Sequence, residues 1–377
     1  CLIINSFLFS QSCLPDELTI NSQEQIDNFQ IDYPGCTTIE GDLYIEGENI
    51  TNLNGLSILT SVGGHLGIFE CSNLTSLNGL NSISEVGSLG IAFNQALINF
   101  NGLNNLEYID DYFLLRGNNS LVNFEGLGNL TSVTGFFEIG SNIDSNYGNK
   151  SLKNLNGLDS LVTIGGTLKI SNNDSLTNIS GLGQLTYVGS ISIGKNYSIE
   201  TLYGLNNITS TSHISIYNNF NLRDLNGLQN IVSITGSLTL NSNINLNNIS
   251  SLVNIESVNG DLTINSCMNL NNLTGLNNVT EINGNLEITW NESLINLEGL
   301  NSLSTLTGTG SLYINNNNAL NDLSGLGNLN RAHSIRIEHN RELSNINALS
   351  NIDSISGGLW IYDNFSLSSI SSFSNLT

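Results

Sequence analysis

Histidines and paired acids are the side chains that could carry out chemistry in this chain, and their spacing does not build a reactive site. The histidines are His65, His213, His333 and His339. They do not follow the spacing of a metal site. Adjacent acids occur at Asp110 and Asp111, and nearby acids at Glu287 and Glu292. No phosphate loop, nucleophile elbow or calcium loop is present in the sequence. We therefore predict no catalytic residue, metal or cofactor.

An enzyme on a β-helix scaffold, acting on polysaccharides, stays open as a minor alternative. Glycoside hydrolysis needs two carboxylates that face each other across a groove. Sequence alone does not show such an arrangement.

Binding chemistry is better represented, because aromatic and arginine side chains recur at outward positions. Such residues are enriched at interface hot spots, although scattered exposed aromatics are also common on protein surfaces. The first group comprises Tyr112, Leu114, Arg116 and Phe136, with Tyr147 in a nearby insertion, and the second comprises Tyr313, Arg336, Trp360 and Tyr362. We predict that one or both groups contact a ligand.

A repeated phrase must position these side chains. Gly-x-Leu-x-Ile begins at Gly41 and returns in about fourteen copies, 23 or 24 residues apart except for one step of 31 and one of 26. A fixed period of this size is typical of a solenoid, in which each copy forms one coil. The extra residues of the long coil, 143–150, should bulge outward as a loop beside the first group. Insertions on solenoids often map to the binding face.

One coil shows how the core is built. Leu168 and Ile170 alternate with polar residues, which is the signature of a half-buried strand. From Leu176 to Val188 an aliphatic residue then recurs every three positions, which suits a chain that turns corners with one side chain inward at each. Near the end of most coils two aliphatic residues stand three positions apart, and a glycine directly precedes the first of them. We predict that this glycine takes a positive φ at one corner; the positions are 55, 79, 102, 126, 157, 181, 204, 227, 275, 299 and 325.

An asparagine or cysteine stands three positions after the strand isoleucine in almost every coil. We predict a buried ladder whose amides satisfy backbone groups at a turn. Its members are Cys71, Asn94, Asn118, Asn142, Asn173, Asn196, Asn219, Asn243, Cys267, Asn291, Asn317, Asn340 and Asn364. Cys71 and Cys267 lie eight coils apart, or about 38 Å at roughly 4.8 Å per strand, so they cannot bridge.

The two ends of the chain differ from the repeat. Residues 1–12 are apolar and then polar, like the remnant of a secretory signal peptide; a short buried strand is the alternative. Residues 13–40 form an N-terminal cap, and Cys13 and Cys36 should close it with a disulfide, as in an oxidising compartment. Residues 41–377 form the repeat domain, which stops within a further coil, so we expect a piece of a longer, secreted or cell-surface protein.

Composition limits the partners. The 377 residues contain 32 acids and nine Lys and Arg, which give a net charge of −23. Phosphate binding depends on clustered Lys and Arg, so this charge argues against nucleic acid. No stretch approaches the roughly 20 apolar residues of a membrane span, so we predict no direct membrane insertion by this part of the protein.

The segment from Cys36 to Ile45, preceded by residues 21–27, resembles the opening of the receptor L-domain. The resemblance extends over about residues 13–377. It implies an all-β, right-handed parallel β-helix that is extracellular, non-catalytic and binds proteins or surface ligands. The chain departs from the family in its larger number of coils and in lacking a cysteine-rich module or kinase, so no ligand residue is carried over.

These observations together predict a non-enzymatic, extracellular or cell-surface solenoid that binds a protein or glycan, as an adhesin or surface-interaction module. A structural spacer or surface-layer component that presents a further domain is the main alternative. Ice binding is a weaker one, because the outward positions between the Leu and Ile of each strand are heterogeneous rather than a regular array of threonines.

Overall fold

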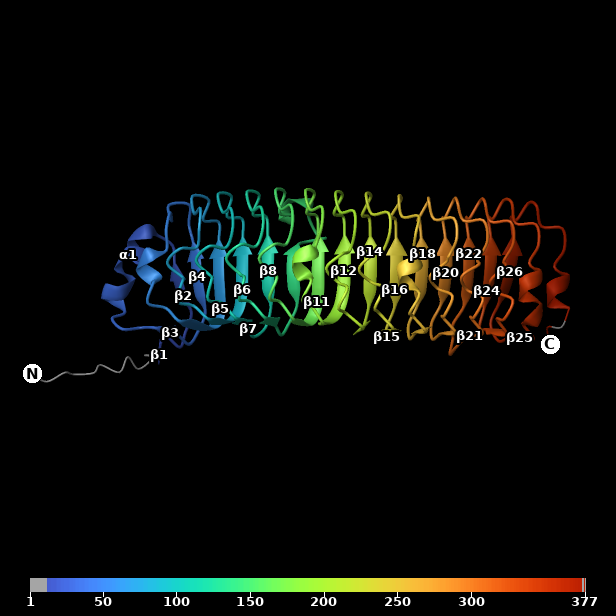
Figure 1. Ribbon diagram of the computed structural model, residues 1–377, viewed down its shortest axis with the longest axis horizontal. Coiled ribbons are helices and arrows are strands. Elements are labelled where there is room, and N and C mark those ends of the chain that lie inside the picture. The colour runs from blue at the N-terminus through green and yellow to red at the C-terminus, as the bar shows by residue number, and fades with distance from the viewer. Residues whose placement is uncertain (1–11, 375, 377) are drawn as a thin grey trace, which may run out of the picture.

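Each Gly-x-Leu-x-Ile phrase forms a strand that pairs in parallel with the same phrase one coil later. In the register of neighbouring coils, Ile214 lies beside Leu238 and Ile216 beside Leu240. The computed structural model describes residues 12–374 and 376. It is an elongated parallel β-solenoid of about fifteen turns, with α1 at one end and β26 near the other (Figure 1). The predicted fold is confirmed.

One face of the solenoid is a long parallel sheet, called here the main sheet face. Its strands are β2 (Leu18–Ile20), β4 (Leu43–Glu46), β5 (Ser61–Phe69), β6 (Glu85–Ala92), β8 (Phe113–Arg116), β10 (Phe137–Gly140), β11 (Thr163–Ser171), β12 (Tyr187–Gly194), β14 (Ile214–Tyr217), β16 (Leu238–Asn241), β18 (Leu262–Asn265), β20 (Leu286–Thr289), β22 (Leu312–Asn315), β24 (Ile335–Glu338) and β26 (Leu359–Tyr362). The first of these, β2, belongs to the cap and pairs with β4, so the cap adds a strand that the repeat does not predict.

Shorter strands build a second face. They are β1 (Ser12–Cys13), β3 (Thr38–Ile39), β7 (Tyr108–Ile109), β9 (Ser132–Val133), β13 (Ser210–Thr211), β15 (Ser233–Ile234), β17 (Ser257–Val258), β19 (Glu281–Ile282), β21 (Thr305–Leu306), β23 (Arg331–Ala332) and β25 (Ser354–Ile355). The long strands β5, β6, β11 and β12 continue around the corner and join both faces.

On the third side of each coil, the backbone changes direction in one of two ways. At most coils a corner glycine has a φ between 103° and 126°, as at Gly157 and Gly204. In other coils a short 3-10 helix replaces this turn: η1 (Asn54–Leu56), η3 (Ser180–Leu182), η4 (Ser250–Leu252), η5 (Asn347–Asn351) and η6 (Ser371–Phe373). Ser251, Ala348 and Ser372 occupy the glycine position there, and a residue with a side chain avoids a positive φ. The prediction for Gly55 and Gly181 is wrong, because both lie in 3-10 helices.

The inward aliphatic side chains form one continuous core, and Leu176 and Val188 are fully buried in it. In the coils around residues 100–137 phenylalanine replaces leucine. Phe113 stacks on Phe137 at 4.5 Å between ring centroids, and Phe100 stacks on Phe124 at 5.1 Å. The core beneath the main sheet strands β8 and β10 is therefore filled by stacked aromatic rings.

The buried asparagine ladder is confirmed. The Asn219 amide nitrogen donates to the Ile193 carbonyl at 2.9 Å, and its side-chain oxygen accepts from the Asn196 backbone N–H at 3.2 Å. Each asparagine thus satisfies one carbonyl and one N–H of the preceding coil, groups that the turn would otherwise leave unpaired. Cys71 and Cys267 take the same position as buried free thiols.

One ladder residue was wrongly predicted. Asn142 is exposed, and Asn149 is the ladder member of the long coil. Asn149 accepts from the Asn118 backbone N–H at 3.0 Å, and its own N–H donates to Asn173 at 3.1 Å. The inserted residues therefore precede the ladder position, and Asn149 and Lys150 are not part of the loop.

The N-terminal end of the core is covered by the cap. Helix α1 (Gln23–Asp32) starts at Ser22, whose side chain accepts from the Gln25 N–H, and it buries Ile26 and Phe29. The predicted disulfide joins Cys13 to Cys36, with Cα atoms 5.7 Å apart. Apart from Ser12, the predicted signal remnant lies outside the described residues.

Candidate functional site

Five rings on the outer side of the main sheet form the aromatic face: Tyr44, His65, Phe69, Tyr112 and Phe136. They come from strands β4, β5, β8 and β10 and the residues just before them. The ring of His65 lies 5.5 Å from Tyr44, 6.0 Å from Phe69 and 5.5 Å from Tyr112. Tyr112 then stacks on Phe136 at 5.1 Å with 4° between the ring planes. Each ring is half-buried, so the face presents both apolar edges and hydrogen-bonding groups.

Two glycines make room for these rings. A Cβ at Gly67 would lie 2.4 Å from the Phe69 ring, and a Cβ at Gly90 would lie 2.7 Å from the His65 ring. Both distances are far below van der Waals contact. The rings of Phe69 and His65 therefore lie over bare backbone in β5 and β6, and a serine at these positions, as later in the chain, would displace them.

A buried glutamate organises the next part of the surface. Glu138 is 6% exposed, and a buried carboxylate needs a cation. Arg116 supplies one at 2.6 Å and Lys169 a second at 3.9 Å. The Lys169 ammonium also lies 5.5 Å from the centre of the Phe136 ring. Leu114 lies beside Glu138 in the strand register. The structure thus brings the first predicted group together.

The inserted loop is fastened onto this surface. Residues 143–146 are exposed, as predicted, but η2 (Ser145–Tyr147) turns the chain back. The Tyr147 ring packs against Phe93 at 5.5 Å and lies 5.8 Å from the Arg116 guanidinium. The Tyr147 carbonyl accepts from the Gly117 N–H at 3.1 Å. Tyr147 therefore extends the surface of Arg116 instead of forming a separate lip.

A shallow groove of about 460 Å³ runs along the side of the aromatic face where the strands begin, and we call it the acidic groove. It is lined by Asp42, Tyr44, Gly63, Gly64, His65, Gly87, Ser88, Asp110, Asp111 and Tyr112. Asp42 accepts from the His65 backbone N–H at 2.7 Å. Burial lowers the pKa of the His65 imidazole despite the nearby Asp42, so this ring is neutral near pH 7.

The two tyrosines of the acidic groove are affected by its acids. The pKa of Tyr44 is raised by burial and then by the charge of Asp42. The pKa of Tyr112 is raised by burial and then by the charges of Asp111 and Asp42. Both phenols therefore stay protonated well above neutral pH and can donate a hydrogen bond.

The second predicted group is more dispersed. Arg336 donates to the Tyr362 hydroxyl at 3.0 Å and lies 2.8 Å from the Glu338 carboxylate. Burial acts to raise the pKa of Glu338, but hydrogen bonds and charge from Arg336 lower it overall. Tyr313 and Trp360 lie beside Arg336 in the strand register, on either side. Trp360 is 49% exposed, and this group holds no stacked rings.

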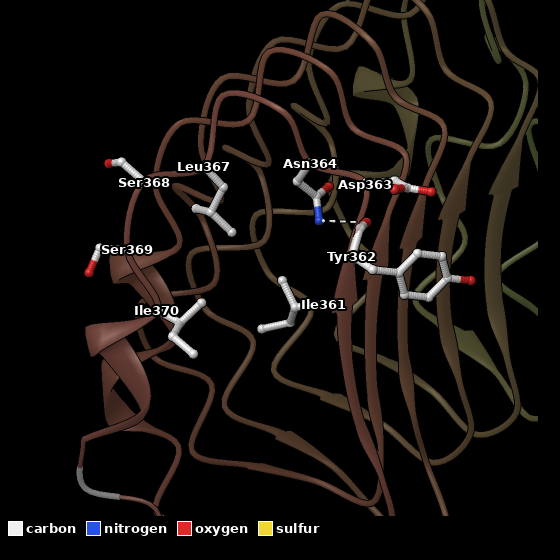
Figure 2. Close-up of a pocket in the computed structure, with 8 residues that line it drawn as sticks. All are labelled: Ile361, Tyr362, Asp363, Asn364, Leu367, Ser368, Ser369 and Ile370. Atoms are coloured by element: carbon white, nitrogen blue, oxygen red, sulfur yellow. Dashed lines mark hydrogen bonds between the residues drawn. The ribbon is translucent and has the colours of Figure 1, made fainter.

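A hollow at the far end of the solenoid is the open cross-section of the coil that contains β26 (Figure 2). Ile361, Asn364, Leu367 and Ile370 line it and occupy repeat positions that are buried in the preceding coil, at Ile337, Asn340, Leu343 and Ile346. The lining of this hollow therefore belongs to the repeated core, and we do not treat the hollow as a candidate ligand site.

Within residues 12–374 and 376, no cluster of three or more His, Cys, Asp and Glu side chains could hold a metal ion. Burial raises the pKa of both free thiols, Cys71 and Cys267, to about 12, which suppresses the reactive thiolate. None of the helices described there is long and apolar enough to cross a membrane.

Sequence reasoning placed neither Phe69 nor His65 in a binding group. Phe69 follows the strand isoleucine, outside the outward position between Leu and Ile. The signal that could have found both was the pair of glycines, Gly67 and Gly90, at outward positions where other coils carry side chains.

The fold and the sheet face define a leucine-rich-repeat-like solenoid with a receptor-L-like repeat. The family model described as Receptor L domain matches residues 254–347, so the predicted resemblance is confirmed there. Solenoids of this class are typically protein-binding modules and generally non-enzymatic.

Several solved structures are similar to the chain, and two of them are described here. One is an internalin (inlF) from Listeria monocytogenes, with 18% identity over 89% of this chain and 85% of that chain and a TM-score of 0.39. The other is a TLR13–ssRNA13 complex, with 15% identity over 91% of this chain and 70% of that chain and a TM-score of 0.27. No curated protein matches the sequence.

Proposed function

We propose that this protein is a non-enzymatic, extracellular or cell-surface module that binds a protein or glycan through the aromatic face. The observation that carries the proposal is the set of five contacting rings between Tyr44 and Phe136, held half-exposed above Gly67 and Gly90. Preorganised rings lose little conformational freedom when they meet a ligand, and aromatic and arginine side chains dominate interface energies.

The surroundings support the same proposal. Arg116, Leu114 and Tyr147 continue the aromatic face with a fixed guanidinium and a further ring. The Cys13–Cys36 disulfide is consistent with an oxidising compartment. The net charge of −23 disfavours the phosphate backbone of nucleic acids as a partner.

The second predicted group is the alternative binding surface. It contains Trp360 and Tyr362, but its rings do not stack on one another as Tyr112 and Phe136 do. We rank it below the aromatic face for that reason.

The test is a paired comparison on protein and glycan arrays. Tyr112→Ser/Phe136→Ser removes the stacked pair, and Tyr313→Ser/Trp360→Ser is the matched control that removes two rings elsewhere. We expect the first variant to lose parent ligands by tenfold or more, on the order of hot-spot effects, and the control to keep them. If both variants bind every parent ligand as well as the parent does, the solenoid is better explained as a spacer. Loss in the control alone would assign binding to the second group.

A further inference from the structure

We propose that the acidic groove binds the cationic side chain of a lysine or arginine from a basic protein segment. The proposal rests on the binding role of the aromatic face and deepens it, because it names the chemistry that one end of the face recognises.

Two tyrosine rings form the walls. Tyr44 and Tyr112 lie in the acidic groove on either side of His65, each 5.5 Å from its ring. The backbone of Gly63, Gly64 and Gly87 lines the space beside them without side chains. An aromatic face attracts a cation within about 6 Å of its centre. Tyr112 lies between His65 and Phe136, so it offers its ring edge and hydroxyl rather than an open face. A lysine or arginine side chain is slender enough to enter a groove whose floor is glycine backbone.

Three carboxylates lie at the same groove, at Asp42, Asp110 and Asp111. Asp42 is used in part by the His65 N–H and by the Tyr44 hydroxyl at 3.4 Å. Across residues 12–374 and 376, no lysine, arginine or histidine forms an ion pair with any of the three. These carboxylates are therefore free to pair with a cation that a partner brings.

The contrast with the neighbouring coils sharpens this point. There Glu138 is neutralised by both Arg116 and Lys169, so the central part of the surface is balanced within the chain. In the acidic groove the nearest titratable ring, His65, is kept neutral by burial. The charges of Asp42 and Asp111 act on the Tyr44 and Tyr112 phenols and contribute to their raised pKa values, so negative charge acts on both ring walls.

The whole chain reinforces the local charge. At −23 it would attract a basic partner over long range and repel phosphate, sulfate and acidic glycans. A neutral sugar could also stack on the tyrosines, but it would leave the three carboxylates without a counter-charge. A basic protein segment satisfies both the rings and the acids, so we commit to that occupant.

The experiment measures binding of octalysine and octa-arginine peptides to the full chain, at about 50 and 150 mM salt to vary screening. Octaglutamate and the neutral sugar cellohexaose are the comparison probes. Asp110→Asn/Asp111→Asn removes two groove charges. Its control, Glu256→Gln/Glu298→Gln, removes two exposed acids elsewhere and makes the same change in net charge, from −23 to −21. A third variant, Tyr44→Leu/Tyr112→Leu, removes the ring walls but keeps apolar bulk.

We expect both basic peptides to bind and octaglutamate not to bind. The aspartate pair should weaken octalysine binding about tenfold and the tyrosine pair about three- to tenfold, as expected for charge pairs and cation–π contacts. The glutamate control should change it less than about twofold. Thermal melting of each variant checks that it is folded, and a variant that does not melt cooperatively is replaced by its single substitutions.

Two results would overturn the proposal: octalysine binding no tighter than octaglutamate, or equal weakening by the aspartate pair and the glutamate control, which would indicate general charge attraction. If the chain instead binds cellohexaose and the tyrosine pair abolishes that binding, the groove recognises a neutral sugar. The aromatic face would then keep its binding role and only its cationic ligand would be wrong. Failure of the array comparison with Tyr112→Ser/Phe136→Ser would reject the binding role itself.

Discussion

The main sheet face carries two different surfaces on one repeating backbone. From β4 to β11 its outward positions hold the contacting rings of the aromatic face and the Arg116–Glu138–Lys169 cluster. From β12 to β18 the position between the strand Leu and Ile holds small polar residues, Ser192, Ser215, Thr239 and Thr263. His213 and Tyr217 lie at the neighbouring outward positions there, but they form no contacting set of rings like the aromatic face. The strand pairing is parallel in both regions, with Leu or Ile beside Leu or Ile.

The comparison shows that core and face vary independently in this protein. We call the coils from β4 to β11 the aromatic region and those from β12 to β18 the polar region. Asn118 in the aromatic region and Asn219 in the polar region make the same ladder bonds. Gly67 and Gly90, by contrast, and the insertion that carries Tyr147, all lie at or beside the aromatic region. Because solenoid coils contact only their neighbours, a surface can be specialised locally without changing coils farther away.

The largest expected effect tests whether the two regions share one core. Asn118→Leu and Asn219→Leu should each destabilise the protein by roughly 1–3 kcal/mol, because a buried carbonyl and a buried N–H lose their partners. The bonds concerned are those to the Ile91 and Ile193 carbonyls, both 2.9 Å. Denaturant unfolding measures both values. A difference of several-fold between the two variants would mean that the ladder is not equivalent in the two regions.

A smaller effect of opposite sign is expected at the ladder cysteines. Cys71→Asn in the aromatic region and Cys267→Asn in the polar region should each stabilise by about 0.5–1.5 kcal/mol, the net worth of an added hydrogen bond. The Cys71 thiol lies 3.4 Å from the Phe69 carbonyl and 3.6 Å from that of Ile45. The Cys267 thiol lies 3.7 Å from the Asn265 carbonyl and 3.9 Å from that of Leu240, and sulfur is a weak hydrogen-bonding partner. A lower melting temperature in either variant would show that the cysteines are preferred for their packing.

The face should respond differently in the two regions. Gly90→Ser places a Cβ 2.7 Å from the His65 ring, so it should displace the rings, change the near-ultraviolet circular dichroism and weaken binding, at a stability cost of about 1 kcal/mol or less. Ser215→Gly is the reverse change at the same repeat position, between the strand Leu and Ile. It should leave the near-ultraviolet circular dichroism unchanged. Identical spectra for the parent and Gly90→Ser would show that the glycine is not needed to seat the rings.

The smallest expected effect is no reaction at all. With a pKa of about 12, the thiols of Cys71 and Cys267 should stay unlabelled by a thiol reagent in the folded protein at pH 8. Both should react after unfolding. Rapid labelling of Cys71 alone would indicate that the aromatic region opens more easily than the polar region does.

Much of the fold was predictable because the repeat specifies it many times over. Leu and Ile at fixed spacing determine the strand register, and the ladder follows from one polar position per coil. The one wrong ladder residue was Asn142, which was predicted where Asn149 is found. In this long coil, counting from the strand isoleucine does not show which asparagine is buried, because the insertion lies between the strand and the ladder position. The strand β2 and helix α1 were missed because the cap does not repeat, although Ser22 and the buried pair Ile26 and Phe29 are a readable helix start.

The candidate site was predictable only in part. Tyr112, Leu114, Arg116, Phe136 and Tyr147 were grouped correctly by their coil positions. The rings that complete the aromatic face, Tyr44, His65 and Phe69, depend on how side chains lie across Gly67 and Gly90. These contacts join side chains at different repeat positions in neighbouring coils, and an alignment of the repeats compares only equivalent positions. They are therefore visible only in the structure.

Site-specific photo-crosslinking tests the central claim, binding through the aromatic face, most directly. A benzophenone amino acid would replace Leu114 in the aromatic region and, in a second protein, Ser215 at the same column in the polar region. Each would be illuminated with a protein or glycan ligand found on the arrays. We predict crosslinks from position 114 and none above background from position 215. Equal crosslinking from both positions, or crosslinking from position 215 alone, would contradict the account.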